Sequence, residues 1–224
     1  MSAVLAAEPS LPQRASKWGE PTWEVATLFP VQGQWTEADY LSLPTNRLVE
    51  LSDGCLEILP MPTKMHQRIL KFLLFVLEVY LRTHPIGEIL PAPLPVRLWP
   101  GKIREPDLVL SLFTRKDASL KIAEGMDLGV EILSEGKENR DRDLVKKRAD
   151  YAKAGVKEYW IVDPEESCVT VLTLDGPKYR LHGEFGPVTQ ATSVLLPGFS
   201  VAVSAVLAAG EGRPRKSAKP RRRR

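Results

Sequence analysis

The sequence predicts a mixed α/β (α+β) domain in which helices flank a mixed β-sheet. The segment from Thr63 to Thr83 has apolar residues at three- and four-residue spacing, which is typical of a buried helix. Several short segments rich in Val, Ile and Leu are bounded by Pro, Gly or Asp, as β-strands are. These two kinds of segment alternate along the chain without an internal repeat, which favours a mixed sheet over an all-helical or all-β fold.

The first predicted elements are a short helix and a hairpin. Segment 36–43 is expected to be a helix with Thr36 as its N-cap. Segment 48–60 reads as two strands around Asp53-Gly54, a dipeptide that favours a tight hairpin turn. The long helix follows directly after this hairpin.

The middle and end of the chain supply the remaining strands. Segment 87–101 alternates prolines with apolar residues, so it can form an extended edge but not a central strand. Better strands are predicted at 107–113 and 127–133, joined by a polar link that we expect to hold a turn of helix. An amphipathic helix follows at 140–154 and ends at Gly155. Later apolar segments lie at 156–164, 169–174, 178–182 and 195–207.

The chain is expected to have three parts. Residues 1–34 form a variable N-terminal extension, residues 35–207 the folded domain, and residues 208–224 a disordered basic tail. The tail carries eight of the 31 Lys and Arg residues and one of the 28 Asp and Glu residues, so the rest of the chain has a formal charge of −4. Such a tail either binds a polyanion or only increases solubility.

Composition excludes several classes of protein. With 43% hydrophobic and 26% charged residues, the chain is neither collagen-like nor wholly disordered. Cys55 and Cys168 are too few for a disulfide framework or a four-cysteine zinc site, which favours a reducing compartment. The N-terminus lacks the features of a signal peptide, and no segment reaches the roughly 20 apolar residues of a membrane span. We therefore expect a cytoplasmic protein with no membrane partner.

Two carboxylates stand in predicted strands. Asp107 follows Pro106 at the start of one strand, and Glu131 interrupts another. A buried carboxylate without a partner costs several kcal/mol, so a cation or a metal is needed. Oxygen ligands suit Mg²⁺, which can polarise a phosphate and activate a bound water. The alternative is that each carboxylate faces solvent.

A lysine for such a site is expected on the following helix. Asp143, Lys147 and Tyr151 are four residues apart and therefore share one face. Lys147 is the candidate that orients or helps to deprotonate the water, with Lys146 on a different face as the alternative. Lys147 could also belong to a solvated, charged helix face.

Five segments carry a family resemblance, in this order: VELSDG, MPTKMHQRIL, EPDLVLSL, GVEILS and DLVKKRADYAKAGVKEYWIVDP. Together they resemble the Uma-two family of restriction-endonuclease-like proteins, which belongs to the PD-(D/E)xK nuclease superfamily. The resemblance covers roughly residues 35–207. It implies a restriction-endonuclease-like core, a phosphodiesterase site that uses Mg²⁺ or Mn²⁺, and DNA as the substrate.

The resemblance also assigns site residues. It implies that Asp107 and Glu131 are metal ligands and that Glu50 completes the metal site. His66 stands where this family usually has His, and its expected contact is a phosphate or a metal-bound water. Two simpler alternatives are that Glu50 pairs with Arg47 or Lys64 and that His66 only bonds the backbone at a helix start.

The sequence departs from the superfamily at one position. Leu133 stands where the ExK motif has lysine, and the family resemblance moves this role to Lys147 on the following helix. The predicted catalytic residues are therefore Glu50, His66, Asp107, Glu131 and Lys147.

The leading hypothesis is a metal-dependent endonuclease that hydrolyses phosphodiester bonds of DNA. The alternative is a catalytically silent nuclease-fold protein that binds DNA or another partner. One active site per chain predicts a homodimer for double-strand cleavage.

Overall fold

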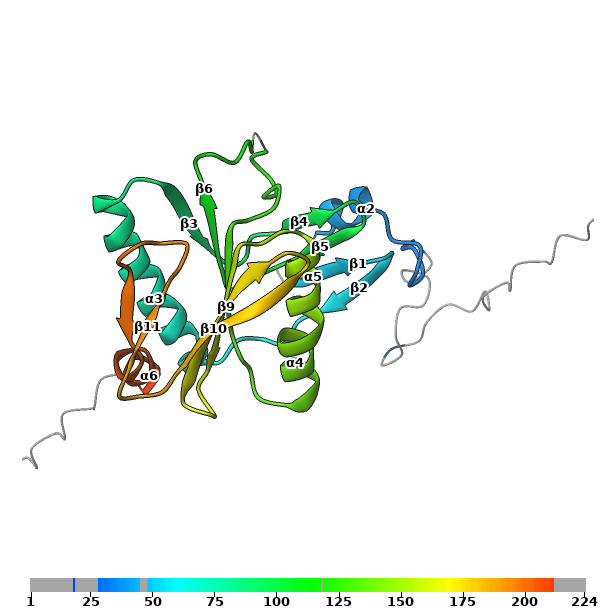
Figure 1. Cartoon of the computed structure of the whole chain (residues 1–224). Coiled ribbons are helices and arrows are strands. Elements are labelled where there is room, and N and C mark those ends of the chain that lie inside the picture. Colours follow the sequence, from blue (N-terminus) through cyan, green and yellow to red (C-terminus); the bar gives the residue numbers. More distant parts are fainter. Residues whose placement is uncertain (1–17, 19–27, 45–47, 118, 212–224) are drawn as a thin grey trace, which may run out of the picture.

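The computed structural model describes residues 18, 28–44, 48–117 and 119–211. Most of the predicted extension, Arg47 and the chain beyond Glu211 lie outside the described residues. The predicted α/β architecture is confirmed: two β-sheets form the body of the protein, and helices cover the larger one (Figure 1).

The larger sheet has six strands and is mixed. Its order is β10 (Lys178–Phe185), β9 (Cys168–Asp175), β8 (Glu158–Asp163), β7 (Leu128–Ile132), β6 (Leu108–Leu112) and β3 (Gly87–Pro91). Strands β7 and β8 are parallel, and the other neighbours are antiparallel. A parallel pair needs a crossover connection, and here the crossover is the helical segment after β7.

Helices pack on both faces of this sheet. Helices α3 (Lys64–Thr83) and α6 (Val203–Glu211) cover one face, where their apolar side chains and those of the sheet form the main core. The other face is covered by α4 (Lys137–Asp141), the π-helical segment η1 (Arg142–Lys147) and α5 (Arg148–Lys153). Helix α3 matches its prediction, with Thr63 as the N-cap.

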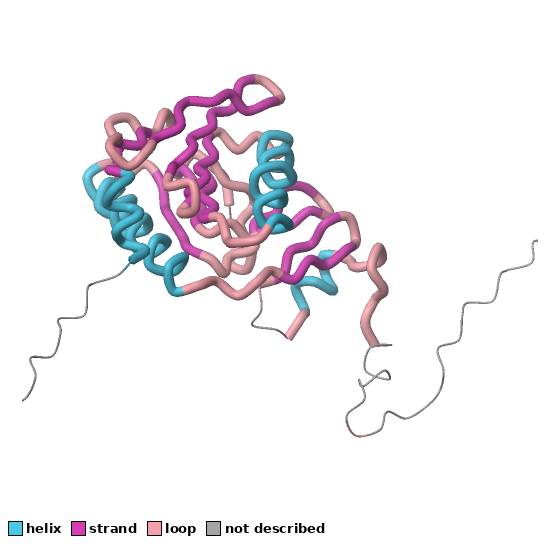
Figure 2. The backbone as a smooth tube through the Cα atoms, turned by 90° about the horizontal axis from the view of Figure 1, so that it is seen from below, coloured by secondary structure: helices cyan, strands magenta, loops and turns pink. Residues whose placement is uncertain are grey.

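The smaller sheet has four antiparallel strands. Its order is β2 (Cys55–Ile58), β1 (Val49–Ser52), β5 (Lys102–Arg104) and β4 (Val96–Trp99). Helix α2 (Glu37–Ser42), which has Thr36 as its N-cap, contributes Tyr40 to a small core with this sheet. Segment 59–63 then leads from the hairpin to α3, along the face seen in Figure 2. Strands β11 (Gln190–Thr192) and β12 (Ser200–Ala202) form a separate pair.

The hairpin confirms the turn that was predicted from its sequence. Asp53 and Gly54 have φ angles of 52° and 80°, so both are in the left-handed region that a tight hairpin turn requires. A Cβ atom at position 54 would lie 2.5 Å from the carbonyl oxygen of Gly33. This position therefore needs glycine for space as well as for backbone conformation.

Other predictions were confirmed only in part, and one was wrong. The proline-rich segment gives two edge strands, β3 in the larger sheet and β4 in the smaller one. The charged helix begins at Lys137, three residues before its predicted start, and contains the unpredicted π-helical turn. The link between β6 and β7 forms no helical turn in its described residues. Helix α6 continues to Glu211, past the predicted end of the domain.

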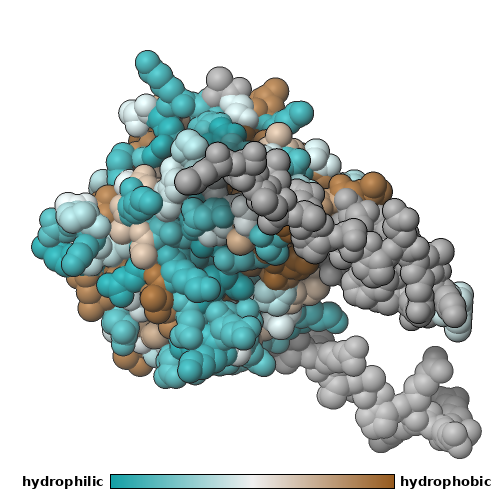
Figure 3. Space-filling model, turned by 90° about the vertical axis from the view of Figure 1, so that its right-hand side faces the viewer, coloured by the Kyte–Doolittle hydropathy of each residue, from teal (hydrophilic) through white to brown (hydrophobic). Residues whose placement is uncertain are grey.

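In the part of the chain that the structure describes, no helix is long and apolar enough to cross a membrane. The face in Figure 3 is mostly hydrophilic, and its hydrophobic side chains form small separate patches.

Candidate active site

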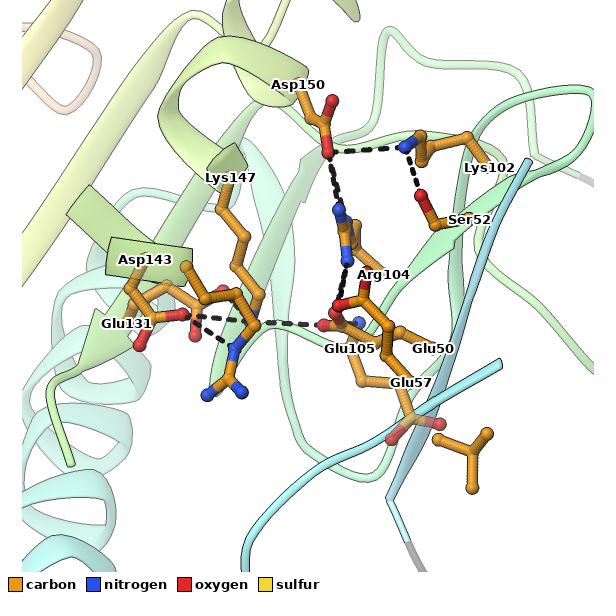
Figure 4. Close-up of polar contacts among 12 residues, drawn as sticks. Glu50, Ser52, Glu57, Lys102, Arg104, Glu105, Glu131, Asp143, Lys147 and Asp150 are labelled. Atoms are coloured by element: carbon orange, nitrogen blue, oxygen red, sulfur yellow. Dashed lines mark hydrogen bonds and ion pairs between the residues drawn. The ribbon is translucent and has the colours of Figure 1, made fainter. Parts of the chain in front are cut away.

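Lys147 is the centre of a buried charge cluster between the two sheets. Its Nζ atom lies 2.9 Å from Oε1 of Glu131, 3.1 Å from Oε1 of Glu50 and 3.5 Å from Oδ1 of Asp143. The side chain is 2% exposed. Figure 4 shows it extending from the helix towards the strands, with Glu131 on one side and Glu50 on the other. Lys146 is exposed, so of the two candidate lysines only Lys147 reaches these carboxylates.

Strand alternation turns Glu131 towards this lysine. Its neighbours Val130 and Ile132 face the core under α3, so Glu131 faces the opposite helix layer. The Tyr151 hydroxyl donates a hydrogen bond of 2.6 Å to Oε1 of Glu131. Asp143, Lys147 and Tyr151 thus share one helix face, as their spacing predicted. Burial raises the pKa of Glu131 to about 8, although Lys147 opposes this effect.

Asp107 lies beside Glu131 at the same end of the sheet. Leu108 is paired with Val130 in the β6–β7 register, which places Asp107 opposite Glu131. Oδ2 of Asp107 accepts a 2.7 Å hydrogen bond from the Ile132 amide and lies 3.1 Å from Nε2 of His66. Burial lowers the pKa of His66, but the hydrogen bond and charge of Asp107 outweigh it and raise the pKa overall. Glu131 is buried, and the side chain of Asp107 is 14% exposed.

Glu50 has all its hydrogen bonds inside the protein. Oε2 accepts from Nη1 of Arg104 at 2.7 Å, and Oε1 accepts from the Glu105 amide at 3.0 Å as well as contacting Lys147. Burial raises the pKa of Glu50, but Lys147 and Arg104 outweigh it, so the pKa is lowered. Glu50 therefore pairs with these two cations and not with Lys64.

Arg104 links the charge cluster around Lys147 to Asp150 of α5. Its Nη2 atom lies 2.8 Å from Oδ2 of Asp150, and its Nη1 atom also lies 3.2 Å from Oε2 of Glu57. The side chain is 2% exposed, so this guanidinium joins β5 to the hairpin and to α5 (Figure 4).

A small cavity of about 40 Å³ opens beside Lys147. Its polar lining consists of His66, Glu105, Asp107, Glu131, Ser134, Arg142, Asp143 and Lys147. Two buried atoms of this lining, Nδ1 of His66 and Oε2 of Glu105, have no hydrogen-bond partner among the described residues. Burial raises the pKa of Glu105 to about 7. The lining therefore has more carboxylates than its cations neutralise.

This donor set fits a divalent cation. Carboxylate oxygens are the ligands that Mg²⁺ and Mn²⁺ prefer, and an unpaired buried carboxylate oxygen needs a positive partner. Among the described residues, however, no group of three or more His, Cys, Asp or Glu side chains is arranged so that it could hold a metal ion. The ammonium group of Lys147 occupies the space between Glu50 and Glu131.

Four of the five predicted catalytic residues line the cavity: His66, Asp107, Glu131 and Lys147. Glu50 lies behind Lys147 and contributes no atom to the cavity. Sequence reasoning missed Glu105 and Arg104. Neither residue interrupts an apolar run of the sequence, so no sequence signal identified them.

Comparisons with known proteins identify the family and the fold of the chain. The model of the family Uma2, described as "Putative restriction endonuclease", matches residues 37–204. A crystal structure of a putative nuclease belonging to DUF820 from Anabaena variabilis has a similar fold, with a TM-score of 0.66 and 19% sequence identity. The similarity covers 79% of this chain and 99% of that one. No curated protein matches the sequence.

Proposed function

Because the chain belongs to the Uma2 family of putative restriction endonucleases, we propose that it is a metal-dependent endonuclease that hydrolyses phosphodiester bonds of DNA. The observation that carries the proposal is the cavity between Asp107, Glu131 and Glu105, where buried carboxylates outnumber cations beside a buried lysine. Four carboxyl groups line this cavity together with the cations Lys147 and Arg142, so when all four are ionised the cavity would repel a phosphate unless a divalent cation is bound.

Asp107, Glu131 and Glu105 are the residues that would hold Mg²⁺ or Mn²⁺ in this proposal. A bound ion of this kind polarises a phosphate oxygen and lowers the pKa of a water molecule. Glu50, which the family resemblance assigned to the metal, instead holds Lys147 through its Oε1 atom.

Lys147 has the role of a charged hydrogen-bond donor. Burial lowers its pKa, but Glu131, Glu50 and Asp143 outweigh this effect and raise the pKa above that of a free lysine. The ammonium therefore keeps its proton at neutral pH and orients the attacking water or stabilises phosphate charge. His66, held by Asp107, faces the same cavity and would contact the phosphate or its water.

Plasmid cleavage tests this function. Highly purified wild-type protein with Mg²⁺ or Mn²⁺ is compared with Glu131→Ala and with an EDTA control. Metal-dependent nicking or linearisation that the variant lacks is the expected result. Cleavage by Glu131→Ala at the wild-type rate would reject this site.

One observation favours a second function. The ammonium of Lys147 already contacts both Glu50 and Glu131 without a metal, as expected of a protein that keeps the nuclease fold but does not cut. DNA binding without cleavage in the plasmid assay would establish this catalytically silent alternative. The predicted homodimer and cytoplasmic location stay predictions, and light scattering of the purified chain tests the first.

A further inference from the structure

We infer that Arg142 binds a phosphate of the DNA backbone at the cavity, through paired hydrogen bonds from its guanidinium group. This inference rests on the proposed function and adds a substrate-binding residue to that site. It is carried by the place of Arg142 in the cavity lining, by the donors that its side chain leaves free, and by the π-helical turn that begins at this residue.

The cations of the cavity differ in what they can offer to a ligand. Among the described residues that line the cavity, Lys147 and Arg142 are the two that carry a positive charge throughout the neutral pH range. Three carboxylate oxygens already lie within 3.5 Å of Nζ of Lys147, and an ammonium group has no further donors. A phosphate could take one of these donors only by displacing a carboxylate. A further donor is therefore needed to bind the substrate before it reacts.

Arg142 has donors to spare. Its Nε atom donates to Oδ1 of Asp143 at 3.4 Å, and its Nη1 atom donates to Oδ1 of Asn139 at 3.3 Å. Both distances exceed the usual N–H···O separation of about 2.9–3.0 Å, so these bonds are weak. Nη2 has no hydrogen-bond partner in the part of the chain that the structure describes. A guanidinium group has more N–H donors than these two contacts use, so donors remain for a ligand.

A neighbouring arginine shows the difference. Arg140 holds Asp163 with two bonds, Nη2 to Oδ2 at 2.6 Å and Nη1 to Oδ1 at 3.1 Å. Short paired bonds of this kind fix an arginine within the fold. Arg142 has no such pair among the described residues, and its side chain is 15% exposed. It can therefore turn its paired donors to a ligand at the cavity.

The π-helical segment η1 brings Arg142 to the side of Lys147. In an α-helix, five residues correspond to a rotation of about 140°, which would turn the two side chains to different sides. In a π-helix the backbone hydrogen bonds join residues i and i+5, which therefore lie nearly one above the other. Arg142 and Lys147 are the first and last residues of η1, and both line the cavity. The unpredicted π-helical turn thus explains how a second cation reaches the site.

A phosphate is the ligand that fits these donors best. The planar fork of a guanidinium group matches two oxygens of a phosphate, whereas an ammonium group acts as a point charge. Phosphates are also the anions that the proposed substrate brings to the cavity. In this arrangement Asp107, Glu131 and Glu105 hold the metal, and Arg142 holds the phosphate beside them.

The test measures DNA binding and cleavage by the full-length chain. Binding is measured with Mg²⁺ in a Glu131→Ala background, which should not cut and has one carboxylate fewer in the cavity. Fluorescence anisotropy with a labelled duplex gives the dissociation constant between about 50 and 200 mM salt. The variants are Arg142→Gln and Arg142→Lys. The matched control is Arg148→Gln, which removes an exposed arginine of α5 that does not line the cavity.

Each lost phosphate contact reduces the slope of log affinity against log salt by about 0.9. We expect Arg142→Gln to reduce the slope by about this amount and Arg148→Gln to leave it unchanged. Arg142→Lys should keep the slope, because it keeps the charge, but bind DNA less tightly, because an ammonium group cannot form the paired bonds. With Glu131 in place, Arg142→Gln should lower kcat by about 10²- to 10³-fold, and Arg142→Lys by less.

An Arg142→Gln variant with the slope and the cleavage rate of Arg148→Gln would overturn the inference. An Arg142→Lys variant with wild-type affinity and rate would also overturn it, because a positive charge beside Asp143 would then be sufficient. Thermal melting checks folding, and if Arg142→Gln does not fold, Arg142→Lys decides by the same criterion.

The proposed function and this inference fail in different ways. If the wild type cuts DNA while Arg142→Gln behaves as the control does, the proposed function stands and only the role of Arg142 is wrong. If the wild type binds DNA without cutting and Arg142→Gln alone loses slope, phosphate binding by Arg142 stands and cleavage is rejected. A wild-type protein that neither binds nor cuts DNA would reject both.

Discussion

Replacing Lys147 by Met should destabilise the protein strongly at alkaline pH. The substitution keeps the length of the side chain but removes the charge that lies within 3.5 Å of three carboxylates. The side chains that carry these carboxylates are each at most 5% exposed. Breaking a buried ion pair by removing one partner costs about 3–5 kcal/mol. We expect a loss of this size in the free energy of unfolding near pH 8.

The loss should be smaller near pH 5. A carboxyl group whose folded-state pKa is raised stabilises the fold at low pH, and this contribution is lost as pH rises through the folded-state pKa. For Glu131 that pKa is about 8 in the wild type, and it rises further without Lys147, because the lysine lowers it. Because the pKa of Glu131 is already about 8, a further rise costs about 1.4 kcal/mol per unit only at pH values above the new pKa. Near pH 8 the pH-dependent loss comes mainly from Glu50: Lys147 lowers the pKa of Glu50, so that pKa rises when the lysine is removed, and the ionised carboxylate then destabilises the fold as pH rises.

Urea denaturation at both pH values, followed by tryptophan fluorescence, measures these energies; of the five tryptophans, Trp160 is buried in the main core. The matched control is Lys146→Met, which removes an exposed lysine and should change stability by less than about 0.5 kcal/mol. The same pair tests catalysis, because only Lys147→Met should abolish cleavage. A Lys147→Met protein within 1 kcal/mol of the wild type near pH 8, or two variants with equal losses, would refute the charge-balance argument.

Three further outcomes are expected. Arg104→Met should lower the free energy of unfolding by about 3–5 kcal/mol, because Glu50 loses a buried partner at 2.7 Å. In urea titrations, the double variant Arg104→Met/Glu50→Gln should recover part of this loss. Mg²⁺ binding should release a proton between about pH 6 and 8 and become tighter as pH rises, because the ion replaces the proton that Glu131 holds. Calorimetry in buffers of different ionisation enthalpy measures this proton release. A Mg²⁺ affinity that does not change with pH would contradict the assignment of Glu131 as a ligand. Gly54→Ala should lower the free energy of unfolding, because backbone strain of about 1–3 kcal/mol adds to the clash of the new Cβ atom with Gly33. An unchanged melting temperature would contradict this prediction.

Local chemistry was enough to predict much of the fold. The Asp53-Gly54 turn, the Thr36 N-cap and the apolar spacing of α3 each depend on neighbours within a few residues, and all three were correct. Strand β5 was missed because three residues are too few to show an alternating pattern. The π-helical turn was missed because its spacing differs by only one residue from that of an α-helix.

The candidate site was predictable where a residue conflicts with its surroundings. Asp107 and Glu131 were found because carboxylates are unusual in apolar strands. Arg104 and Glu105 lie in a short polar segment where charges are ordinary, so nothing in the sequence distinguished them. Their importance comes from contacts with residues far away in the chain, such as the bond from Arg104 to Glu50, 54 residues earlier.

The cluster around Lys147 joins the two sheets, and this has a consequence for folding kinetics. Glu50 belongs to the smaller sheet, and Lys147 to the helical segment that follows the strand of Glu131, so the contact between Glu50 and Lys147 closes a long loop of the chain. Contacts of this kind form late, because the entropy of loop closure must be overcome first. In a refolding experiment, the fluorescence of the larger core should recover before cleavage activity does. A newly synthesised chain would then lack the proposed nuclease site until both sheets have docked.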